Sequence, residues 1–446
     1  MLRVPRRFQQ KGKAMGTGGD QLSFFAANRE QPILLAGARI SGADGQVKQA
    51  DILIGTDGRI AAVGPDLAPQ QNAVRVDVSG NLISPGFVDM HQHLDKTGVL
   101  RFTPNPSGTL QGAREAFAAY ARTAGPEDIT LRAARTMARC LSRGTTAIRS
   151  HVNVDKDAGF NGIEALARLR EDWADRMTLQ LVAFMTPHPG QDLDWLTENV
   201  DLAVGFADAV GGTPAVSEDS ECYMDVLFEA AARAGKPVDL HLDEHLDPGN
   251  LHIHAALDRV ERFGMQGRTV FSHISVLSAL EPGAARAIME RMIALDVGAV
   301  TLPAANLYLQ ARDHTKLPPR GLTRVAELLR DGAKIATASD NIQDPFVPTG
   351  SGDMLEIARW TLLAGNLMAD ELCDVHRMIT DIPAGLMELG ADYGIRPGAW
   401  ADLVVTDCED TDTLVAGGPL RSLVLARGRL VSETAAVLRQ DLVEPA

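Results

Sequence analysis

Short apolar runs alternate with helical stretches through the middle of this chain, and this alternation restricts the fold more than any other feature. Eight runs are typical of strands: residues 82–90, 145–154, 178–184, 202–210, 237–243, 268–275, 296–302 and 333–340. Helical stretches separate them, for example residues 130–144, 222–235 and 284–295. Strands that alternate with helices form parallel sheets covered by helices. The pattern alone leaves two solutions, a (β/α)8 barrel of the TIM type or a doubly wound open sheet.

Polar side chains at the ends of these runs favour the barrel. In a barrel the C-terminal ends of all strands converge on one mouth, where active sites lie. The ends of the runs carry His91, His93, His151, His241, Glu244, His273 and Asp340. We therefore predict an α/β fold with a TIM-type (β/α)8 barrel over residues 83–397.

Both ends of the chain add β-like segments. Residues 33–80 hold apolar runs separated by Gly-Ala-Asp-Gly and Thr-Asp-Gly, which predict antiparallel hairpins. The segments ADLVVTD and SLVLARGRLV repeat this style near the C-terminus. We expect one small β-sandwich built from residues 31–82 and 398–446, and a flexible tail over residues 1–30.

Charge, cysteines and hydropathy exclude several classes of protein. The net charge of −15 argues against a nucleic-acid partner, because binders of the phosphate backbone present a basic face. The four cysteines lie far apart in the sequence, which fits a reducing cytoplasm. No apolar run approaches the ~18 residues that a membrane span needs. These features predict a cytoplasmic protein with neither a nucleic-acid nor a membrane partner.

The sequence also predicts a catalytic metal site at the barrel mouth. His91 and His93 are two residues apart, so both project from the same face of a strand. With His241 and the strand-end carboxylate Asp340, they form a ligand set that suits a divalent ion and leaves a position for water. Glu244 follows His241 by three residues and can reach over the site, although an acidic solvated loop would look the same. His151 is either a second polar participant or a hydrogen-bonded barrel histidine.

Six segments, in order, resemble the amidohydrolase superfamily and within it the cytosine deaminase branch: PGFVDMHQHLD, RSHVNVD, HLDEHLD, FSHIS, NLYLQAR and SDNIQDPFVPTG. The resemblance covers roughly residues 33–432. It implies one zinc or iron ion held by His91, His93, His241 and Asp340. It also implies Glu244 as the proton shuttle and His273 as the residue that holds and polarises the attacking hydroxide. Self-association is an expectation from the family alone.

A one-metal site is expected, because two-metal relatives generally use a carboxylated lysine from the fourth strand. Residues 177–235 contain no lysine.

The resemblance implies a hydrolytic deaminase that releases ammonia or an amine from a small nitrogen heterocycle, with Asp340 accepting a proton. Two positions depart from cytosine deaminases, since Thr186 replaces their glutamine and Asn341 replaces a second aspartate. We therefore expect a differently substituted cyclic amidine, such as isocytosine, an amino- or alkylamino-triazine or creatinine. The candidate substrate contacts are Gln310, Thr186, Asn341 and Trp360. A ring-opening cyclic amide hydrolase is the alternative, and a non-catalytic scaffold is a more distant one.

Overall fold

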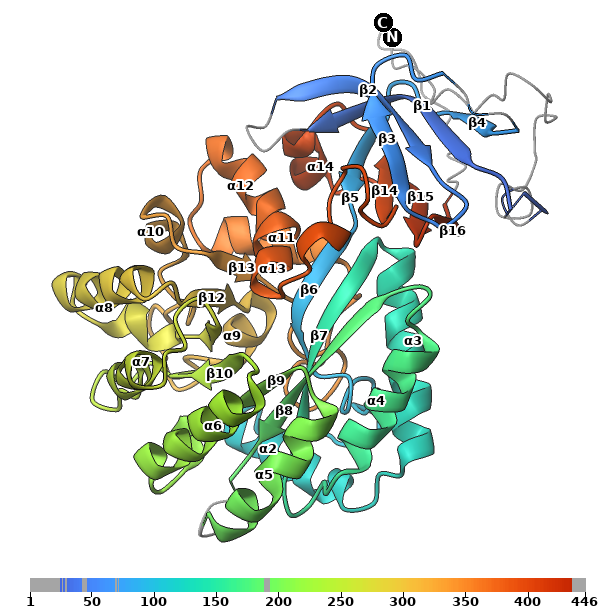
Figure 1. The fold of residues 1–446 in the computed structure, drawn as a ribbon. Coiled ribbons are helices and arrows are strands. Elements are labelled where there is room, and N and C mark those ends of the chain that lie inside the picture. The colour runs from blue at the N-terminus through green and yellow to red at the C-terminus, as the bar shows by residue number, and fades with distance from the viewer. Residues whose placement is uncertain are drawn as a thin grey trace, which may run out of the picture.

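Two sheets organise the protein. The computed structural model describes residues 25, 27, 28, 30–41, 46–68, 70, 72–187 and 193–434. Figure 1 shows a barrel of parallel strands surrounded by helices and, beyond one end of it, a second sheet built from both ends of the chain. The predicted tail falls almost entirely outside the described residues. Phe25, which the sequence placed in that tail, is only 6% exposed and packs in the core of the second sheet.

Eight parallel strands form the barrel, which confirms the predicted fold class. Each strand pairs with the next along the chain, as expected when a helix follows each strand. Their burial is nearly continuous, because helices cover the outside and side chains fill the inside. The strands are β6 (Phe87–Gln92), β7 (Thr145–Val154), β8 (Thr178–Met185), β9 (Ala209–Gly212), β10 (Val238–Leu242), β11 (Thr269–His273), β12 (Gly298–Thr301) and β13 (Ile335–Thr337).

Helices surround the barrel, and further helices come after its last strand in the sequence. Their buried positions recur at helical spacing on the face that packs against the strands. They are α2 (Leu110–Ala121), α3 (Pro126–Ser142), α4 (Asn161–Asp172), α5 (Asp194–Phe206), α6 (Ser220–Ala234), α7 (Ile253–Arg262), α8 (Pro282–Ala294), α9 (Pro303–Leu309), α10 (Val325–Arg330), α11 (Met354–Ala364), α12 (Leu372–Arg377), α13 (Asp381–Leu386) and α14 (Thr411–Gly417). No helix in the described part of the chain is long and apolar enough to cross a membrane.

The prediction of a fourth barrel strand at residues 202–210 placed that strand too early in the sequence. Most of that run lies in α5, and the barrel strand β9 begins only at Ala209. The buried residues Leu196, Val200 and Val204 recur every four positions, so the apolar residues of this run continue a helical stripe. A short strand rich in glycine follows, because a Cβ at Gly211 would lie 2.4 Å from the Asp239 carbonyl oxygen of the neighbouring strand.

The second sheet joins strands from the two chain ends in the order β16-β15-β14-β5-β1-β2-β3, with β4 also pairing with β1. β1 pairs antiparallel with β2, but it is parallel to β4 and β5, so the expectation of hairpins throughout was only partly correct. The strands are β1 (Ile33–Ser41), β2 (Val47–Ile54), β3 (Ile60–Gly64), β4 (Val74–Asp77), β5 (Leu82–Pro85), β14 (Leu403–Thr406), β15 (Arg421–Ala426) and β16 (Arg429–Glu433).

The chain passes from the second sheet to the barrel at Gly86. The first predicted barrel run, residues 82–90, is therefore two strands, since β5 belongs to the second sheet and β6 to the barrel. A Cβ at Gly86 would lie 2.1 Å from Thr146 Oγ1, so only glycine allows this close passage.

The barrel closes between its first and last strands through a narrow contact. An isolated parallel bridge joins Gln92, at the end of β6, to Asp340, in the segment after β13. The Asp340 amide donates to the His91 carbonyl oxygen at 2.8 Å, and the Ser339 amide donates to Asp89 Oδ1 at 3.0 Å. The closing contacts therefore lie among residues that the sequence assigns to the site.

Candidate active site

Four predicted side chains meet at the C-terminal end of the barrel. His91 and His93 come from the end of β6, His241 from β10 and Asp340 from the segment after β13. His91 Nε2 and His93 Nε2 each lie 3.1 Å from His241 Nε2. Asp340 Oδ1 lies 3.6 Å from His91 Nε2 and 3.3 Å from His93 Nε2. All four side chains are buried.

The hydrogen bonds behind these histidines direct their lone pairs toward one point. His93 Nδ1 lies 3.0 Å from the His151 carbonyl oxygen, which can only accept, and 3.1 Å from the Lys96 ammonium, which can only donate. Because the ammonium has Asp95 and Asn153 as other acceptors, we assign the Nδ1 proton to the bond with His151. Ser272 Oγ donates to Asp239 Oδ1, so it accepts from His91 Nδ1 at 2.9 Å. Both Nε2 atoms are then unprotonated and face the cluster, as metal-binding histidines do.

The cluster fits a divalent metal ion. Ligands about 2.0–2.1 Å from a tetrahedral ion lie roughly 3.3–3.4 Å from one another, close to the separations above. Burial lowers the pKa of His91, His93 and His241 well below the usual range, so the rings are neutral and can act as ligands. Burial raises the pKa of Asp340 well above its usual range, and among the described residues Oδ1 has no hydrogen-bond partner. A bound cation would compensate this buried carboxylate.

Two other groups of metal-ligand side chains are less suited. His91, His151 and Asp239 lie close together, but Asp239 already pairs with Arg149 at 2.9 Å. Asp243, His245 and His252 form the third group. The Asp243 carboxylate accepts from the backbone amides of His252 and Ile253 at the start of α7, which is the role of a helix cap.

Glu244 and His273 lie beside the cluster. Glu244 Oε1 is 3.4 Å from His273 Nδ1, and His273 Nε2 is 3.9 Å from Asp340 Oδ2. Burial raises the pKa of Glu244 to about 7, so about half of these side chains carry a proton at neutral pH. Burial, with the nearby charge of Arg114, lowers the pKa of His273 to about 3, so its ring is neutral.

The backbone is strained at two of these positions. His273 has φ 68° and Asp340 has φ 60°, a region that non-glycine residues seldom adopt. Such strain costs on the order of 1–3 kcal/mol per residue and clusters at functional sites.

A cavity of about 420 Å³ opens over the cluster, in the size range of small-molecule sites. Thr186 and Asn341 line it, together with Glu244, His273 and Asp340. Gln310 is not among the lining residues, and its amide donates to the Glu244 carbonyl oxygen at 3.0 Å, where it positions the loop. Trp360 lines a separate small cavity that also touches Asn341. The structure therefore places two of the four candidate substrate contacts in the main cavity.

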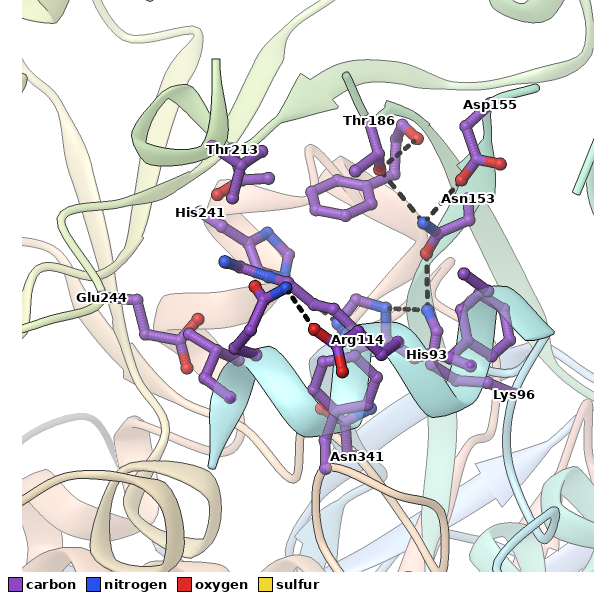
Figure 2. Close-up of a pocket in the computed structure, with 18 of the residues that line it drawn as sticks. His93, Lys96, Arg114, Asn153, Asp155, Thr186, Thr213, His241, Glu244 and Asn341 are labelled. Atoms are coloured by element: carbon purple, nitrogen blue, oxygen red, sulfur yellow. Dashed lines mark hydrogen bonds between the residues drawn. The ribbon is translucent and has the colours of Figure 1, made fainter. Parts of the chain in front are cut away.

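Sequence reasoning missed several lining residues. Asn153 in β7 and Asp155, directly after it, follow His151 at two-residue spacing, so the alternation of the strand could have identified them. Lys96 follows the His-x-His pair, and its ammonium bonds Asn153 Oδ1 at 2.7 Å and pairs with Asp95 at 3.2 Å. Figure 2 shows this polar chain along one wall of the cavity. Arg114 comes from α2, where no sequence pattern indicated it.

The chain is similar to known proteins over most of its length. A sequence model of the amidohydrolase family matches residues 125–431. Pterin deaminase of Rhizobium rhizogenes is 28% identical over 420 residues, which cover 92% of this chain and 94% of the relative. N-isopropylammelide isopropyl amidohydrolase of Pseudomonas sp. is 29% identical over 370 residues, covering 80% of this chain and 87% of the relative.

Solved structures of other proteins share this fold over most of the chain. The crystal structure of 5-methylcytosine deaminase from Klebsiella pneumoniae, liganded with 5-fluorocytosine, aligns with a TM-score of 0.84 and 27% identity, covering 92% of this chain and 99% of that one. N-isopropylammelide isopropylaminohydrolase from Burkholderia multivorans aligns with a TM-score of 0.79 and 29% identity, covering 92% and 100%.

Proposed function

The chain belongs to the amidohydrolase family, and from this premise we propose that it is a hydrolytic deaminase of a nitrogen heterocycle that uses one divalent metal ion. The observation that carries the proposal is the position of Glu244, a carboxyl group with a pKa of about 7, beside the four-residue cluster in the same cavity. The names of the relatives, which include pterin and 5-methylcytosine deaminases, support this reaction class.

His91, His93, His241 and Asp340 would hold the ion. A divalent ion, when bound, lowers the pKa of a coordinated water toward ~7 and so supplies hydroxide at neutral pH. Asp340 Oδ1 faces the histidine nitrogens, whereas Oδ2 faces His273. Asp340 Oδ2 is therefore the atom placed to receive the proton of the attacking water.

Glu244 supplies the proton that the heterocycle needs. Attack at the ring carbon that bears the exocyclic amine places negative charge on the adjacent ring nitrogen. The protonated Glu244 carboxyl delivers its proton to that nitrogen. The resulting carboxylate then takes the remaining proton of the attacking oxygen and passes it to the departing amine, so the C–N bond breaks as the carbonyl forms. A pKa near the working pH suits a group that both gives and takes a proton.

His273 orients the attacking oxygen. The Asn306 amide donates to His273 Nδ1 at 3.1 Å, so the proton of this neutral ring lies on Nε2. His273 Nε2 is buried without a hydrogen-bond partner among the described residues. It is thus a donor directed at the reaction site, where it would stabilise the oxygen of the tetrahedral centre.

The test is amine release by the metal-loaded protein. We would offer cytosine, isocytosine, creatinine, pterin and amino- or alkylamino-triazines, and measure ammonia or alkylamine together with metal content. The Glu244→Gln variant is the matched control, since it should keep the metal. Release by the wild type alone supports the proposal.

Two results would contradict deamination. Consumption of a cyclic amide with ring opening and no free amine would indicate the alternative hydrolase. A protein that binds stoichiometric metal yet releases amine from none of these rings would show that the substrate class is wrong.

A further inference from the structure

Arg114 brings a positive charge into the cavity. It lies on α2, whose face formed by Gln111, Arg114, Glu115 and Ala118 lines the cavity wall. Figure 2 shows Arg114 extending into the middle of the cavity, between Glu244 on one side and His93 and Lys96 on the other.

None of the described residues forms a hydrogen bond or ion pair with this guanidinium, although the Arg114 side chain is half-buried. Burial lowers the pKa of Arg114, because the charged guanidinium loses contact with water. The nearby charge of Glu244 raises this pKa in part. Other arginines of the region are paired, for example Arg122 with Asp157 at 2.8 Å and Arg132 with Asp128 at 2.9 Å.

Burying a charged group without a partner costs free energy, and a bound ligand of opposite charge would offset that cost. The chain contains 58 acidic residues against 43 basic ones, yet none of those that the structure describes forms an ion pair with Arg114. A guanidinium offers five donors in a planar fork, which matches a carboxylate through two parallel hydrogen bonds. A neutral ring carbonyl would occupy only part of that fork.

We propose that the substrate carries a negatively charged substituent, with a carboxylate as the best geometric match, and that Arg114 binds it. This inference rests on the proposed function, because it assigns a chemical class to the substrate of the same site. Arg114 then determines specificity, and a ring without the acidic group leaves the guanidinium unpaired.

The experiment compares matched pairs of ligands that differ only in a carboxylate. Pterin with 6-carboxypterin and cytosine with 5-carboxycytosine are suitable. Titration calorimetry on the zinc-loaded protein gives the ratio of the dissociation constants within each pair, and turnover gives the ratio of kcat/KM. We expect the wild type to prefer the carboxylated member of at least one pair by tenfold or more. The preference should fall below threefold in Arg114→Met and be partly kept in Arg114→Lys.

Arg122→Met is the control, because Arg122 lies on the same side of the cavity but is already paired with Asp157. It should keep the preference of the wild type. The proposal is overturned if the wild type binds no carboxylated ligand more tightly than its parent. It is also overturned if Arg114→Met weakens both members equally, which would mean that Arg114 acts only through the charge of Glu244.

Binding and turnover separate the two claims. Selective binding that depends on Arg114, without release of amine, would leave this inference standing and refute deamination.

Discussion

Replacing Glu244 by glutamine should abolish turnover and, at the same time, stabilise the metal-free protein. The amide keeps the size of the side chain but cannot give up a proton to the ring. General acid–base groups contribute typically ~10² to 10⁴ in rate, so kcat should fall by about that factor. Metal content should not change, because Glu244 is not part of the four-residue cluster.

The gain in stability follows from the pKa of Glu244. Its usual value of 4.5 is raised to about 7 by burial, so the folded protein holds the proton more tightly than the unfolded chain. Folding is then favoured below pH 4.5, and this contribution is lost as the pH rises through 7. The loss grows by about 2.5 kcal/mol between pH 5 and pH 8. Glutamine has no such titration, so the variant avoids the loss.

The assay is urea unfolding of both metal-free proteins at pH 5 and pH 8. The stability difference in favour of Glu244→Gln should be small at pH 5 and larger at pH 8. A difference that does not increase with pH would refute the assignment of a raised pKa to Glu244. A variant that turns substrate over within a few-fold of wild type would refute its role as the proton shuttle.

Two further predictions concern the metal and a distant histidine. Removal of the metal with a chelator should abolish turnover and lower the melting temperature, since four buried ligands lose their shared cation; retention of more than a tenth of the activity would contradict a catalytic metal, and re-addition of zinc or iron identifies the ion. His376 is buried against Ser84 Oγ at 2.8 Å, and burial lowers its pKa from 6.5 to about 4. The unfolded chain binds this proton first as the pH falls, so wild type should lose about 2 kcal/mol between pH 8 and pH 5 through this residue. In urea unfolding, the stability of His376→Gln should therefore fall less between pH 8 and pH 5 than that of the wild type. An equal fall in both proteins would contradict the lowered pKa of His376.

The rule that strand ends meet at one mouth predicted most of the site. The pair His91 and His93, His241 and Asp340 come from three distant parts of the sequence, yet each lies at the end of an apolar strand, and the structure brings them within 3.6 Å of a neighbour. The rule needs only the type and order of the elements. Small errors in the bounds of strands do not move a side chain to another end of the barrel.

Features that depend on packing between distant segments could not be predicted from the sequence. Arg114 enters the cavity because α2 packs through Ala113 and Phe117, and nothing in the sequence fixes how that helix lies across the mouth. The break between β5 and β6 depends on Thr146 approaching Gly86 from a different strand. The apolar residues of the stretch 202–206 are compatible with a strand or with a helix. Only the helical spacing that continues from Leu196 shows that this stretch is a helix.

The narrow contact that closes the barrel has a consequence during protein synthesis. Its two sides come from residues near 91 and near 340, and both carry members of the four-residue cluster. A chain still on the ribosome has no complete ligand set until its last barrel strand has emerged. Metal uptake at the proposed site would therefore require the ring of strands to be finished.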